Sequence, residues 1–361
     1  MRALLGCVLI ALAASGCTGK GRASGGASDR PDVPLLEGLG AHVRKITTAD
    51  AVAQRYFDQG LNLLYAFNHD EAIRSFQEAA RLDPSCAMAW WGVAIANGPH
   101  INNPAVPPER ARAAREALGR ARDGGAAASE TERALIAALA SRHADPEPDR
   151  KPLDAAYAAA MREVRRRFPG DADVGALYAE AMMDLRPWDL WTADGRPQQG
   201  TDEIVATLET VLAKSPRHPL ALHLYVHALE ASPRPEQADA AADRLRDLTP
   251  GLGHLVHMPS HVDVRRGRWQ QAIVANEKAM QADRRYRSIR PKQGFYGLYI
   301  AHNHHMLGYA AMMAGQSEKA IRAMDAMIST MRIPKRRGAG GRGSRAAADG
   351  GAAPRVSAAT A

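Results

Sequence analysis

Residues 56–85, "YFDQGLNLLYAFNHDEAIRSFQEAARLDPS", decide the fold of this chain. Small residues recur in this stretch at Gly60, Ala72 and Ala79, and the bulky Phe76 lies among them. Small side chains let two helices approach closely, and Phe76 can fill the space between them. Pro84 ends the second helix because proline has no backbone N–H to donate. The stretch therefore predicts two closely packed helices.

The spacing of these residues resembles the tetratricopeptide repeat, a 34-residue pair of antiparallel helices. In that register Trp90 falls where the family favours tryptophan, and Pro216 and Pro250 lie one repeat apart. The register covers residues 53–86, resumes at 87, and returns over 219–252, 253–286 and a last repeat from 301. Between these regions the pattern is looser but still helical. The resemblance implies an all-α fold, a tetratricopeptide-type α-solenoid of about six antiparallel helix pairs.

Composition agrees with helices and excludes a nucleic-acid partner. Of 361 residues, 46% are hydrophobic but only 5% are aromatic, and alanine is abundant. The formal net charge is +8, but seven basic residues against Asp349 place most of it after residue 331. The rest of the chain is nearly neutral, so no basic face remains to hold a phosphate backbone.

The first residues form a targeting signal. Arg2 precedes the apolar run "ALLGCVLIALAA", which is too short to span a bilayer permanently. "ASGC", residues 14–17, resembles the end of a bacterial lipoprotein signal, although Ala14 replaces the usual leucine. The resemblance implies cleavage before Cys17 and lipidation of its thiol. By the family's rules Thr18, directly after the cysteine, favours the outer membrane of a Gram-negative cell. The alternative is an ordinary secretory signal with an incidental cysteine.

These features divide the chain into four parts. We predict a lipoprotein-type signal peptide over 1–17, a flexible linker over 18–48, the solenoid over 49–331 and a disordered basic tail over 332–361. The protein is then exported and membrane-anchored on the periplasmic side. The tail leaves Met324, Met327, Ile328 and Met331 on an uncovered last helix. Either a partner covers them, or the chain is shorter than its relatives, for example after a reading-frame change.

Histidines gather on one face of the repeats. In tetratricopeptide proteins positions 2, 5, 9, 12 and 13 of each first helix line a concave groove. The register places there His223, His227 and Glu230, then His254, His257 and His261, and finally His302 and His305. Chance would put about half a histidine on these positions, so the clustering is not an accident of composition.

Such a wall of imidazoles suits a metal ion. Histidine is the commonest side-chain ligand, and pairs four residues apart, as at His223 and His227 or His257 and His261, can share one zinc or copper ion. Pro259 would bend the helix that carries the second pair. Two alternatives remain: a structural hydrogen-bond network, or an imidazole surface that binds a peptide. The other histidines are interpreted as satisfied core or surface residues: His42, His69, His100, His143, His218 and His304.

Aromatic side chains occupy the other groove positions. Phe57, Tyr65 and Trp91 fall on groove positions, and the inserted "PWDLW" carries Trp188 and Trp191. These residues either grip a ligand or form additional core under the inserted loop. No nucleophile or oxyanion device is identified, so no catalytic residue is predicted.

Two longer blocks of the sequence resemble one group of proteins. "GHLVHMPSH", residues 253–261, and "FNHDEAIRSFQEAARLDPSCAMAWWG", residues 67–92, resemble a group of bacterial tetratricopeptide proteins without a settled activity. The sequence therefore predicts a lipid-anchored, exported scaffold that binds a peptide or protein segment in a histidine-rich groove. The alternative is a metal-binding protein, or a metal-dependent enzyme, that uses the groove histidines with zinc or copper.

Overall fold

A computed structural model describes residues 33–145 and 149–331. This part of the chain is helical, with no β-strand beyond two isolated bridges. The predicted signal peptide with Cys17, the first part of the linker and the tail 332–361 lie outside the described residues. Within those residues, none of the helices has both the length and the apolar character needed to cross a membrane.

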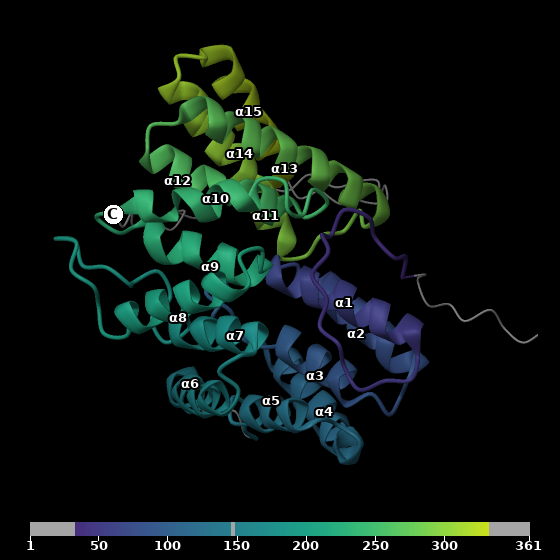
Figure 1. Cartoon of the computed structure of the whole chain (residues 1–361). Coiled ribbons are helices and arrows are strands. Elements are labelled where there is room, and N and C mark those ends of the chain that lie inside the picture. Colours follow the sequence, from purple (N-terminus) through teal and green to yellow (C-terminus); the bar gives the residue numbers. More distant parts are fainter. Residues whose placement is uncertain (1–32, 146–148, 332–361) are drawn as a thin grey trace, which may run out of the picture. The chain divides into compact units, whose positions relative to one another are not determined.

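The helices follow one another as antiparallel neighbours. They are α1 (Ala51–Tyr65), α2 (His69–Leu82), α3 (Ala87–Ala96), α4 (Pro108–Asp123), α5 (Glu130–Ala140), α6 (Arg150–Arg167), α7 (Ala172–Met183), α8 (Thr201–Lys214), α9 (Pro219–Glu230), α10 (Asp239–Leu245), α11 (Gly253–His257), α12 (Pro259–Arg265), α13 (Trp269–Ile289), α14 (Tyr296–Met313) and α15 (Ser317–Met331). Short 3₁₀ turns, Gly124–Ala126 and Pro235–Ala238, follow α4 and precede α10. Successive helices pack against each other (Figure 1), and the chain is an all-α, tetratricopeptide-type α-solenoid.

The described residues make seven helix pairs, one more than the approximate prediction. The looser stretch 87–218 supplies three of them, α3 with α4, α5 with α6 and α7 with α8. The first pair packs as its small residues predict. A Cβ atom on Gly60 would lie 2.7 Å from the ring of Phe76, and one on Gly92 of α3 would overlap the same ring. Glycine is therefore required on both sides of Phe76.

Residues 35–48 correct the linker prediction. This segment has no helix, but it lies against three different helices of the solenoid. The backbone N–H of Leu36 donates to Gln59 of α1, the Arg44 guanidinium pairs with Asp171 before α7, and Thr47 donates to Glu132 of α5. Leu39 and Ile46 are buried. The segment is bound because its polar groups find partners all along its path, and these partners are distant in the sequence.

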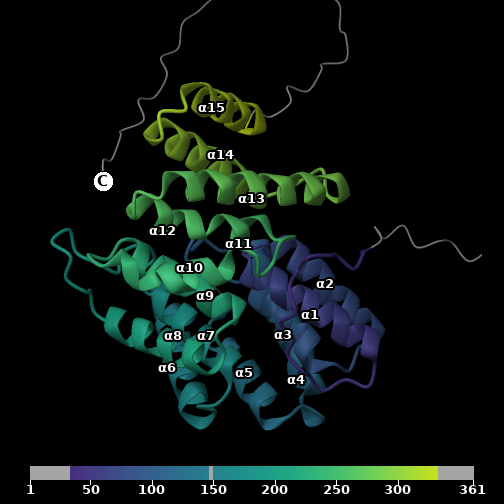
Figure 2. The same cartoon turned by 45° about the horizontal axis from the view of Figure 1, so that its top comes forward.

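The predicted open groove is filled by the first helix pair. Figures 1 and 2 both place α1 and α2 beside α9 and α11. Buried Glu71 of α2 accepts hydrogen bonds from Tyr286 and Arg290, at the end of α13, at 3.1 and 3.0 Å. The Phe67 ring, in the turn after α1, lies 4.4 Å from the ring of His223. The inner face of the C-terminal repeats is therefore interior.

The last pair ends the described solenoid with apolar side chains in solvent. Met312, Ile321 and Ile328 are exposed. Of the residues predicted to be uncovered, Ile328 lies on this exposed face, while Met324 packs onto Gly308 of α14.

Candidate metal centre

Three of the predicted histidines meet nitrogen to nitrogen between α9 and α11. The Nε2 atom of His223 lies 3.1 Å from the Nε2 atoms of both His227 and His254. We call these residues trio A. All three side chains are buried, and their ligand atoms lie within 4.8 Å of one another.

A second group of the same kind lies directly beside the first. The Nε2 atom of His261 lies 2.8 Å from that of His257 and 3.4 Å from that of His302. These three residues, from α11, α12 and α14, form trio B. The two trios are neighbours, since the ring centroids of His227 and His261 are 5.7 Å apart.

Helix geometry explains both trios. Positions four apart on α9 place His223 and His227 on one face. Pro259 separates α11 from α12, and the N–H of His261 donates to Met258, three residues back, instead of four. This tighter turn keeps His257 and His261 together across the break that proline was predicted to cause. His254 and His257, on the single turn of α11, therefore serve different trios.

Hydrogen bonds fix which nitrogen carries the proton in four of the six rings. Nδ1 of His223 lies 2.8 Å from the Tyr65 carbonyl oxygen, which can only accept a hydrogen bond. Nδ1 of His257 lies 2.8 Å from Oδ1 of Asn276, whose amide nitrogen donates to Ala272. In the neutral rings Nδ1 therefore bears the hydrogen, and Nε2 presents a lone pair to the centre of the trio.

Glu230 fixes one further ring in each trio. Its carboxylate accepts from Nδ1 of His227 at 2.7 Å and from Nδ1 of His261 at 2.5 Å. Burial opposes its ionisation, but His261 and His227 hold the pKa of Glu230 well below its usual range. Glu230 was predicted to belong to the ligand pool. Both of its oxygens are engaged by imidazoles, so its place is behind the ligands, where a carboxylate orients metal-binding histidines.

Histidines of both trios have lowered pKa values, so they bind protons weakly. Burial lowers the pKa of His223, His254 and His257 well below the usual histidine value, and neighbouring histidines lower it further. Burial also lowers the pKa of His302 to about 3. Near neutral pH these four rings are therefore neutral.

Two aromatic residues in a strained backbone conformation contact trio A. Among the described residues, Phe67 and Trp188 are the non-glycine residues with positive φ, at 56° and 62°. The Phe67 ring packs on His223 and His254, and the Trp188 ring meets His227 edge-on at 5.1 Å. Such a conformation costs about 1–3 kcal/mol and is commonly found at functional sites. Both strained residues therefore point to this centre.

The remaining site predictions have mixed outcomes. His305 is exposed, with its ring 6.2 Å from that of His302, and belongs to neither trio. Phe57 and Trp91 are core residues, because the helices α1 and α3 face neighbouring helices instead of an open groove. Buried Tyr65 holds His223 through its carbonyl.

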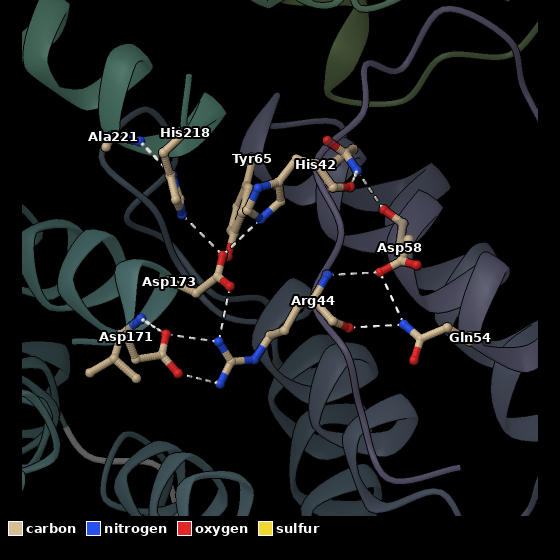
Figure 3. A network of polar contacts seen from close by, with 11 residues as sticks. His42, Arg44, Gln54, Asp58, Tyr65, Asp171, Asp173, His218 and Ala221 are labelled. Carbon is tan, nitrogen blue, oxygen red and sulfur yellow. Dashed lines mark hydrogen bonds and ion pairs between the residues drawn. The ribbon is translucent and has the colours of Figure 1, made fainter. Parts of the chain in front are cut away.

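A third cluster, missed by the sequence interpretation, resembles a metal site but differs in its protons (Figure 3). Asp173 of α7 accepts from Nε2 of His42 and His218 at 2.9 and 3.1 Å, and from the hydroxyl of Tyr65 and the guanidinium of Arg44. His42 and His218 were interpreted as isolated residues. No sequence signal joins them, since His42 lies in the predicted linker.

The tautomer of His218 argues against a metal in this third cluster. Its Nδ1 accepts the backbone N–H of Ala221 at 3.2 Å, so Nε2 carries the hydrogen that it donates to Asp173. Burial opposes ionisation of Asp173, but its hydrogen bonds with His218 and His42 hold the pKa of this carboxyl well below its usual range. Every polar atom facing the carboxylate is a donor, so the network binds residues 42–44 to α7 without an ion.

Comparison with known proteins adds little. No protein-family model matches the sequence, and no curated protein matches it. Solved structures with some likeness include MamA (16% identity, TM-score 0.37, covering 50% of this chain and 90% of that one). Others are the TPR domain of P58(IPK) (13%, 0.23, covering 77% and 84%) and the APC/C hetero-tetramer Cut9–Hcn1 (14%, 0.21, covering 77% and 67%). These similarities are low.

Proposed function

We propose that this protein binds two transition-metal ions, zinc or copper, one in each histidine trio. One observation carries the proposal: in each trio, two imidazoles whose Nδ1 is held by an acceptor bring their Nε2 atoms together, at 3.1 Å for His223 and His227 and at 2.8 Å for His257 and His261. Two lone pairs repel at that distance, and a cation between them turns the repulsion into coordination. Four of the six rings have Nδ1 held by a hydrogen-bond acceptor, the arrangement that orients histidine ligands in metal sites.

The spacing of the nitrogens fits these ions. Two nitrogens bound to one tetrahedral zinc ion, each at about 2.0–2.1 Å, lie about 3.3–3.4 Å apart. The shortest separation in trio B, 2.8 Å, requires a small outward rotation of a ring. Imidazole-only sites suit zinc and copper, and three protein ligands leave one position for water or another small ligand. Glu230 has no free oxygen to act as a base, so we propose ion binding and assign no reaction.

The peptide-binding scaffold and the cellular address remain proposals. Phe57, Tyr65 and Trp91 are buried and cannot hold a peptide, whereas Trp188 and Trp191 border a pocket. The exposed apolar side chains of α14 and α15 offer a second surface for a protein partner. We further propose that the protein is exported and anchored through Cys17, which places the metal centre outside the cytoplasm.

Metal content and the substitution Glu230→Gln test the ion proposal together. Protein equilibrated with zinc or copper and then dialysed should carry two ions per chain by elemental analysis. Glu230→Gln should lower the affinity for both ions by about 10–100-fold, because this one carboxylate orients a ligand in each trio. Competition titration with a coloured chelator measures both affinities.

His305→Ala is the matched control. It removes an exposed histidine from the helix that carries His302, so both ions should be retained at unchanged affinity. Wild-type protein that takes up less than one ion per chain, with thermal stability unaffected by either metal, would exclude the proposed function.

The anchor has its own test. Cells given a labelled fatty acid should incorporate the label into the full-length protein, and Cys17→Ser should abolish incorporation because the acylated thiol is missing. Fractionation should then move the variant from the membrane fraction to the soluble fraction. Equal labelling of the two proteins would contradict the anchor and leave an ordinary secretory signal.

A further inference from the structure

A pocket of about 280 Å³ opens beside trio A, between α9 and the loop 184–200. Trp188, Trp191, Met183 and Leu190 give it an apolar lining, and His227 and Glu230 line it as well. A pocket with an apolar lining and a few polar groups is the usual form of a small-ligand site. Its lining therefore includes a proposed metal ligand and the carboxylate that orients it.

The two tryptophans differ in how firmly they are held. The indole nitrogen of Trp191 donates to the carbonyl of Ala228 at 2.7 Å, which fixes this indole to α9. Trp188 is 58% exposed although it lines the pocket, and its backbone is in the left-handed region. Nothing in the fold of the loop requires an indole there, since glycine would adopt that conformation without strain. An exposed, strained aromatic side chain over a pocket is suited to contact a ligand.

One cation at the pocket has no anionic partner. Arg265, which lines the pocket, donates to the carbonyl of Ser232 at 3.2 Å, and no carboxylate of the described residues pairs with it. Arg186, the other guanidinium of the pocket, is paired with Asp189 at 2.8 Å. A guanidinium bonded only to a carbonyl retains donors for a carboxylate, which it can bind with two hydrogen bonds.

We propose that this pocket binds an aromatic ring carrying a carboxylate, with the ring between Trp188 and Trp191 and the carboxylate on Arg265. The volume admits one six-membered ring with a short side chain, because it lies just under the range of about 300–1,000 Å³ of drug-sized sites. Two sources share this chemistry, a free aromatic acid and the C-terminal aromatic residue of a peptide. This proposal adds to the proposed metal function the class of small ligand that binds beside trio A. Binding of the aromatic acid does not depend on the metal function, but the coupling between acid and ion rests on it.

The consequence is coupling between ligand and metal. A ring in the pocket contacts His227 and Glu230, so it changes the affinity of trio A for its ion. By linkage the ion must change the affinity for the ligand by the same factor. The affinity of trio B for its ion should change less on ligand binding, because Glu230 is the link between the pocket and trio B.

The binding test uses three probes and the full chain. Phenylacetate represents the free acid, Gly-Gly-Phe the peptide terminus, and Gly-Gly-Phe amide lacks the carboxylate. Calorimetric titration should show saturable binding of at least one acid and at least tenfold weaker binding of the amide. Arg265→Gln should lower the affinity for both acids at least tenfold, so that the protein no longer binds them more tightly than the amide. Trp188→Gly should weaken every probe without unfolding the loop, since glycine relieves the backbone strain.

Trp90→Phe is the matched control, because Trp90 stacks with Arg120 on another part of the surface and should leave binding unchanged. Each titration is made on chelator-treated and on ion-loaded protein. Absence of saturable binding, or equal binding of acids and amide, overturns the pocket proposal. Binding of the acids by a protein that takes up no metal supports the pocket and overturns the proposed metal function, so the two failures are distinguishable.

Discussion

Chelator-treated protein is expected to lose several kcal/mol of its free energy of unfolding between pH 7.5 and pH 5, a range in which most globular domains are near their maximum stability. The groups responsible are buried imidazoles whose pKa is lowered by burial. The pKa of His69 is about 4 and that of His302 about 3, while those of His100, His223, His254 and His257 lie well below the usual value. Acid sensitivity therefore follows from packing neutral histidines together.

The sign follows from proton binding in the two states. Below about pH 6.5 the unfolded chain protonates these histidines, while the folded chain keeps them neutral. The unfolded state then binds more protons, so the free energy of unfolding falls as the pH falls. Each ring contributes about 1.4 kcal/mol per pH unit below that value, so six rings remove about 8 kcal/mol by pH 5.5. Burial raises the pKa of Asp184 and Asp283 to about 6 and that of Glu180 to about 8, so these carboxyls bind protons in the folded state and offset roughly half of that loss. The remaining loss of about 4 kcal/mol approaches the whole stability of a marginal domain, about 5 kcal/mol.

Urea unfolding followed by circular dichroism from pH 7.5 to pH 5 measures this slope. His100→Gln removes one of these rings and should make the slope shallower by about 1.4 kcal/mol per pH unit. Ion-loaded protein should resist acid until protons displace the metal, after which the two forms behave alike. A free energy of unfolding that stays constant over this range would show that the imidazoles are not neutral and buried as described.

The helix pairs could be predicted because their signal is local. Gly60, Ala72 and Phe76 lie within one repeat, and their spacing alone dictates how two neighbouring helices touch. The same register assigned His223, His227, His254, His257 and His261 to one face of their helices, and in the structure these side chains meet in two groups. It could not show that those faces are buried, because the covering contact joins Tyr65 to His223, 158 residues away.

The grouping of the ligands was beyond sequence analysis for a different reason. Spacing pairs His257 with His261, but it does not assign His254, one turn earlier, to the other trio. Proton positions depend on Asn276 and on the Tyr65 carbonyl, partners that a residue pattern does not identify. The same limit explains why His42 and His218 were taken as isolated residues. Residue type alone does not separate their donor network from the lone-pair trios.

The pair His257→Ala and His261→Ala is expected to abolish one metal site and leave the other. Trio B would keep His302 alone, and a single imidazole cannot hold an ion against dialysis, so its affinity should fall by at least about 1,000-fold. Trio A loses no ligand, and Glu230 still accepts from His227. Elemental analysis should therefore give one ion per chain where the wild type gives two.

The matched control for this pair is His304→Ala with His305→Ala, which removes two histidines from α14 outside both trios and should retain two ions. His302→Ala provides a second route to the same result if the core pair impairs folding, since it removes the least buried ligand of trio B. Loss of exactly one ion in both variants requires two separate centres. Loss of both ions together would mean that the six imidazoles form a single cooperative site, and retention of both would remove His257 and His261 from the coordination sphere.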